Sequence, residues 1–101
     1  MSQKKQPNDK FGTVLKTVGL NIRKFRYQNT LTQQELAKKS GIALLSLYKI
    51  EKGIYGAKLK TLFDIASSLN VNLIDLIADE NILFLNKEKL SLLLKDEEDN
   101  K

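Results

Sequence analysis

The sequence predicts an all-α protein with five helices and a C-terminal extension that should hold a sixth. Two observations lead to this fold class. Apolar residues recur at steps of three and four along the chain, which places them on one face of a helix. Glycine, threonine and asparagine stand between these runs, where they can cap helix ends. No run of alternating apolar and polar residues outcompetes the helical period, so we expect no β-sheet.

Residues 1–9 hold the only proline and show no apolar periodicity, so we expect a disordered basic arm there. A first helix should follow this arm and end near Gln28. Its apolar face has the spacing of one side of a helix and consists of Phe11, Val14, Leu15, Val18, Ile22 and Phe25.

The next two helices are short. Thr32 and Glu35 have capping-box spacing, which predicts that the second helix begins there, and Gly41 interrupts it about two turns later. A third apolar run begins after Ala43, and Gly53 should end it by adopting the left-handed conformation.

A fourth helix is expected at roughly 59–69, closed by Asn70, and Asn72 can cap a fifth helix. That helix should complete the core with Leu73, Ile74, Leu76 and Ile77. We therefore expect one domain over 10–80. Beyond it, residues 81–101 combine an apolar run at 82–85, a leucine-rich segment at 90–94 and an acidic terminus. We interpret this extension as a segment that closes the core or forms a dimer interface.

Charge is distributed unevenly along the chain. Residues 1–60 carry 13 Lys and Arg against 3 Asp and Glu, a net charge of +10, whereas residues 61–101 carry 4 against 9, a net charge of −5. Basic surfaces attract nucleic acid through counterion release, although they also serve solubility.

The composition argues against several function classes. The chain has no cysteine and no histidine, so it lacks the commonest metal ligands and the commonest general base, and we expect no metal or cofactor. Asp75, Asp79 and Glu80 form an acidic cluster, but carboxylates without a histidine or a glycine-rich phosphate loop are usually just solvated. We therefore expect that the protein is not an enzyme. No apolar stretch is long enough to span a membrane, and the polar N-terminus lacks the core of a signal peptide, so we expect a cytoplasmic protein.

Residues 33–52, QQELAKKSGIALLSLYKIEK, have the spacing of two helices that cross at a tight turn. Ala37 is small where the helices approach, and Gly41 permits a left-handed turn. The shared core would be filled by Leu36, Ile42, Leu47 and Ile50. This joint pattern predicts a helix-turn-helix.

The chain resembles the Xre/Cro, or lambda-repressor-like, family of phage and bacterial repressors. The resemblance lies in NIRKFRYQNTLTQQELAKKSGI, IEKG and LFDIASSLNVNLIDLI, and it covers about residues 14–78. It implies that the second helix crosses the phosphate backbone of double-stranded DNA and that the third enters the major groove. It also implies a homodimer on a palindromic operator.

The resemblance also implies roles for single residues. Gln33 matches a glutamine that contacts a phosphate and braces the reading helix, although it can also be an ordinary polar surface residue. Arg26 and Glu51 match a charged pair that joins the first helix to the end of the third, and we interpret this pair as structural.

The groove-facing positions would be Ala43, Leu44, Leu45, Ser46, Tyr48 and Lys49. Leu44 and Leu45 stand where the family usually has polar residues, and Ala43 stands where it has a Ser or Thr cap. The leucines can pack against thymine methyl groups, which would favour A·T-rich operators, while Lys49 can reach guanine or a phosphate. Alternatively, one leucine turns inward and DNA shape supplies specificity, or the pair binds a protein.

Further lysines can contact the backbone or simply be solvated. Lys52, Lys58 and Lys60 flank the loop after the third helix, and Lys4, Lys5 and Lys10 can reach along the duplex. The sequence therefore predicts a DNA-binding transcriptional regulator, a repressor or controller. The alternative is an antitoxin whose segment 82–94 covers a toxin protein while its helix-turn-helix regulates its own operon.

Overall fold

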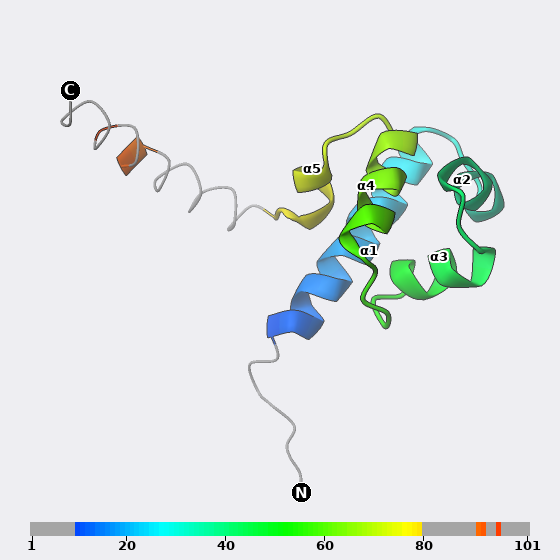
Figure 1. Cartoon of the computed structure of the whole chain (residues 1–101), viewed down its shortest axis with the longest axis horizontal. Coiled ribbons are helices and arrows are strands. Elements are labelled where there is room, and N and C mark those ends of the chain that lie inside the picture. The colour runs from blue at the N-terminus through cyan, green and yellow to red at the C-terminus, as the bar shows by residue number, and fades with distance from the viewer. Residues whose placement is uncertain (1–9, 80–90, 93–94, 96–101) are drawn as a thin grey trace, which may run out of the picture.

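The computed structural model describes residues 10–79, 91–92 and 95, and this part of the chain contains five helices and no strand (Figure 1). Their bounds are α1 (Lys10–Gln28), α2 (Gln33–Ser40), α3 (Leu44–Glu51), α4 (Leu59–Ser68) and α5 (Leu73–Ile77). The prediction of an all-α fold is confirmed, and the expected helix ends agree with these bounds to within one residue. None of the described helices is long and apolar enough to cross a membrane.

The helices pack as a closed ring. Their main contacts run from α1 to α3, α2, α4, α5 and back to α1. α1 is the longest helix, and its N-terminal turns, blue in Figure 1, extend beyond the others. The core inside the ring takes its fully buried large side chains from all five helices and the residue that follows α4: Ile22, Leu36, Leu47, Ile65, Leu69 and Leu76.

Local sequence signals determine the helix ends. The Thr32 hydroxyl accepts the Glu35 N–H at 3.0 Å, and the Glu35 carboxylate accepts the Thr32 N–H at 2.8 Å, so both halves of the capping box are present. Gly41 has φ 72°, a left-handed conformation that closes α2 and turns the chain into α3. Asn70 is also left-handed, with φ 61°.

Two apolar residues expected in the core lie on the surface instead. Phe11 is 65% exposed because the first turn of α1 extends past the helices that would cover it. Ile74 is 49% exposed because it lies about 200° around α5 from the buried Leu76.

The arm at 1–9, with Lys4 and Lys5, lies outside the described residues, whereas Lys10 is the exposed first residue of α1. Most of the extension at 81–101 also lies outside them. Residues 91–92 and 95 have helical backbone, and the division of the chain into arm, domain and extension stays a prediction.

The crossing of α1 and α3 depends on Gly19. A Cβ at this position would stand 2.4 Å from the carbonyl oxygen of Glu51 and 2.8 Å from that of Ile50, well inside van der Waals contact. Gly19 therefore allows the backbone at the end of α3 to lie directly on α1.

We expect Gly19→Ala to lower the free energy of unfolding by about 1–3 kcal/mol, because the methyl group would push α3 away from α1. Inside a helix, replacing glycine by alanine ordinarily adds roughly 0.5–1 kcal/mol of stability, so the sign of the change tests the close approach. Urea unfolding measures it. Lys24→Ala, an exposed change on the same helix, should alter stability by at most about 0.5 kcal/mol.

Candidate nucleic-acid interface

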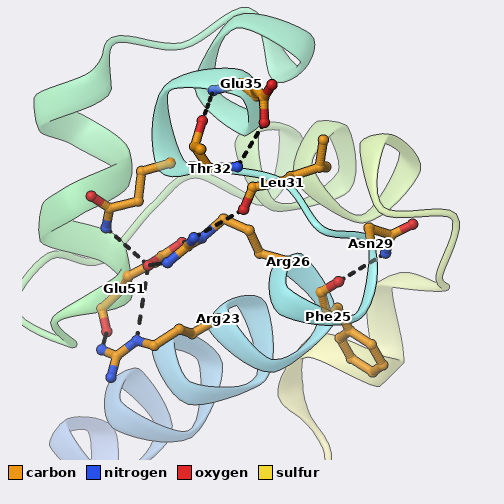
Figure 2. Close-up of polar contacts among 9 residues, drawn as sticks. Arg23, Phe25, Arg26, Asn29, Leu31, Thr32, Glu35 and Glu51 are labelled. Carbon is orange, nitrogen blue, oxygen red and sulfur yellow. Dashed lines mark hydrogen bonds and ion pairs between the residues drawn. The ribbon is translucent and has the colours of Figure 1, made fainter.

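The carboxylate of Glu51, at the end of α3, joins three helices (Figure 2). Its two oxygens accept hydrogen bonds from Nε and Nη2 of Arg26 on α1, at 2.7 and 2.9 Å. Nε2 of Gln33, the first residue of α2, donates to the same carboxylate at 3.0 Å. The expected pair of Arg26 and Glu51 is therefore a bidentate ion pair, and Gln33 lies where it can brace α3.

This ion pair is buried. The Arg26 side chain is 8% exposed and that of Glu51 is 1% exposed. Arg26 also donates from Nη1 to the carbonyl oxygen of Leu31, at 3.1 Å, just before α2. The hydrogen bonds to Glu51 raise the pKa of Arg26 above its already high value, so the guanidinium stays charged at any physiological pH.

Beside the ion pair, an open groove of about 700 Å³ is lined by residues of α1, the start of α2 and α3. We call it the α1–α3 groove. Its lining is polar, basic and aromatic, and comprises Arg23, Arg26, Tyr27, Thr32, Gln33, Gln34, Leu44, Tyr48, Glu51 and Lys52. Glu51 is the one carboxylate among these residues, and Arg26 neutralises it. The cations Arg23 and Lys52 therefore leave the groove with a net positive charge.

Arg23 is held at the wall of this groove. Its Nη2 donates to the backbone oxygen of Glu51 at 2.9 Å, while its Nε lies 3.9 Å from the Glu51 carboxylate. The side chain is 36% exposed, so part of the guanidinium faces solvent. Lys52 also lines the groove, and its Nζ lies 5.7 Å from the ring centroid of Tyr48.

The outer face of α3 carries most of the predicted contact residues. Leu47, Ile50 and Glu51 are buried, whereas Leu44, Leu45, Tyr48 and Lys49 are exposed and Ser46 is half-buried. Leu44 is 46% exposed and Leu45 61% exposed, so the alternative in which one of them turns into the core is wrong. The exposed Ala43 occupies the N-cap position of α3 and makes no capping hydrogen bond with its side chain.

The three predicted backbone-contacting lysines lie in different settings. Lys52 caps the C-terminus of α3 and lines the α1–α3 groove. Lys58 is the exposed N-cap residue of α4. Lys60, in the first turn of α4, makes an exposed ion pair with Asp64 at 2.8 Å, and this carboxylate competes with a phosphate for the same ammonium group.

Sequence reasoning missed Arg23, Tyr27 and Gln34, which also line the groove. A signal was available for Arg23. It precedes Arg26 by three residues, and on a helix this spacing places the two guanidinium groups on one face. Since Arg26 was expected to reach the end of α3, Arg23 could have been placed beside it.

Comparison with known proteins agrees with this arrangement. A family profile described as helix-turn-helix matches residues 22–76, which is more than half of the chain and includes the whole α2–α3 motif. The chain belongs to the helix-turn-helix family. These are Xre/Cro-like DNA-binding regulators of transcription, and the predicted resemblance is confirmed.

Individual members of the helix-turn-helix family are similar to this chain. An uncharacterised HTH-type transcriptional regulator of Methanocaldococcus jannaschii is 37% identical over 60 residues, which cover 59% of this chain and 91% of the relative. The immunity repressor protein of Bacillus phage phi105 is 30% identical over 83 residues, covering 82% of this chain and 56% of the repressor.

A solved structure of the same family has a similar fold. The restriction-modification controller protein C.AhdI from Aeromonas hydrophila superposes with a TM-score of 0.60 at 26% identity, and the match covers 61% of this chain and 94% of the controller.

We expect Glu51→Ala to lower the free energy of unfolding by about 3–5 kcal/mol, because it leaves the Arg26 guanidinium buried without its carboxylate. Replacing both residues by methionine should recover part of this loss, because no buried charge is then left unpaired. Urea unfolding of both variants measures the difference. Lys60→Ala breaks an ion pair in which the lysine is 80% exposed, so it should cost less than about 0.5 kcal/mol. A similar small loss for Glu51→Ala would contradict the structural role.

Proposed function

We propose that this protein is a sequence-specific repressor or controller that binds a palindromic operator as a homodimer in the cytoplasm. The main support is the combination of an exposed α3 face with a net positive groove beside it. A major groove accommodates one α-helix, and flanking cations and helix N-termini bind the adjacent phosphates. A role in DNA binding also accounts for the basic charge of residues 1–60.

In this proposal the residues divide into two sets. Leu44, Leu45, Ser46, Tyr48 and Lys49 face base edges, together with Ala43 at the start of α3. The phosphate contacts come from Gln33 at the N-terminus of α2, from Arg23 and Lys52 in the α1–α3 groove, and from Lys58 and Lys60. Phosphate contacts place the helix on the duplex, and base contacts distinguish sequences.

The proposed dimer has apolar surface available on the domain itself. Leu59 and Phe63 lie one turn apart on α4 and are 66% and 56% exposed. Exposed apolar surface of this kind is typical of protein contacts. The extension at 81–101 is the second candidate for the dimer interface. The antitoxin alternative rests on residues 82–94 of this extension, and no described contact supports it.

Selection of bound fragments from a random DNA pool tests the proposal. We expect two half-sites related by two-fold symmetry, with centres about 10 base pairs apart or a multiple of that distance. The mass in solution should be twice the 11.5 kDa of one chain. A chain that lacks residues 81–101 shows whether the extension holds the dimer together. Selection of no preferred sequence would contradict sequence-specific binding, and a monomeric mass would contradict the proposed homodimer.

Salt dependence tests the groove. We expect Arg23→Ala and Lys52→Ala each to reduce the slope of log affinity against log salt by about 1.8, because each removes one phosphate contact from each subunit of the bound dimer. Electrophoretic mobility shifts at several salt concentrations measure this slope. Lys24→Ala is the matched control, since it removes an exposed positive charge beside Arg23 but outside the groove lining. Equal slopes for all four proteins would show that the groove does not hold phosphate.

A further inference from the structure

The first turn of α3 presents an apolar surface where a DNA-reading helix would meet the bases. Leu47, Ile50 and Glu51 face the core, and with about 100° between successive residues Leu45 lies opposite them. Leu45 is therefore at the middle of the outer face and is 61% exposed. Leu44 lies to one side of it, at the edge of the α1–α3 groove.

Neither leucine is needed to fill the core, because Leu47 and Ile50 already do so at 0% and 2% exposure. A leucine side chain also has no hydrogen-bond donor or acceptor, so neither Leu44 nor Leu45 can read a base edge through side-chain hydrogen bonds. On the outer face of α3, the polar side chains are those of Ser46, Tyr48 and Lys49.

The major groove exposes one apolar group that differs between base pairs, the C5 methyl group of thymine. We propose that Leu45, with Leu44 beside it, selects thymine by packing against this methyl group. The inference rests on the proposed function and specifies which chemical group the first turn of α3 reads.

The surroundings of the leucines favour DNA over a protein partner. Lys49 lies one turn along α3 from Leu45, and Lys52 and Arg23 lie in the groove that Leu44 borders. Lysine is depleted at the centre of protein interfaces, where its charge would lose water without a partner. Phosphates on both sides of a major groove would supply partners for these cations.

Deoxyuridine provides a direct test, because it pairs as thymidine does but lacks the C5 methyl group. We expect deoxyuridine at the contacted positions of the selected operator to weaken binding by wild-type protein roughly fourfold per methyl removed. Titration of labelled duplexes that carry single substitutions measures this ratio.

Two variants separate methyl contact from an effect of the base on DNA shape. In Leu45→Ala the ratio between thymine and deoxyuridine duplexes should fall to about one, whereas a shape effect would persist. Lys49→Ala should bind both duplexes more weakly and keep the ratio. Because both side chains are exposed, thermal unfolding should show that both variants remain folded.

The possible outcomes also distinguish this inference from the proposed function. Equal affinity of wild-type protein for thymine and deoxyuridine at every operator position would overturn methyl reading while operator binding stands. The same would follow if Leu45→Ala kept the wild-type ratio. Failure of the random pool to give any preferred sequence would instead refute the proposed function itself.

Discussion

The structure depends on the burial of one carboxylate, that of Glu51. A buried charge is costly unless it is paired and its remaining hydrogen-bonding positions are filled. Arg26 of α1 and Gln33 of α2 meet this requirement from two directions, and Arg23 holds the backbone oxygen of the same residue. The ends of three helices are consequently fixed at one point.

This arrangement explains how such short helices can present a defined surface. α2 and α3 have eight residues each, and isolated helices of that length are marginal in water. Their order must come from tertiary contacts, which are the core on one side and the Glu51 cluster at the end. Gly19 also contributes to this order, because it allows the end of α3 to pack directly on the backbone of α1. The outer face of α3 is thus held by groups that do not themselves lie on it.

Sequence reasoning placed the features that act locally. The capping box at Thr32 and the left-handed Gly41 follow from residue type and spacing, and resemblance to a family supplied the partnership of Arg26 and Glu51. The features that sequence reasoning missed depend on which helices pack against each other. From the sequence alone, Gly19 is only a residue of low helix propensity, and its role follows from the position of α3 against it. Phe11 keeps the helical period, yet it lies on the surface because no neighbouring helix extends over it. Ile74 is exposed because it lies on the side of α5 opposite the buried Leu76.

The length of α3 limits how much information one copy of the chain can read. Eight residues rise about 12 Å, the length of roughly four base pairs. A given sequence of four base pairs recurs by chance about once in every 250 positions. A single helix of this kind would therefore find thousands of chance matches among the roughly 10⁶ or more sites of a genome. Two such four-base-pair sequences at a fixed separation recur about once in 65,000 positions. The distance between the α3 helices of the two subunits would then help to specify the operator, together with the base sequence of each half-site.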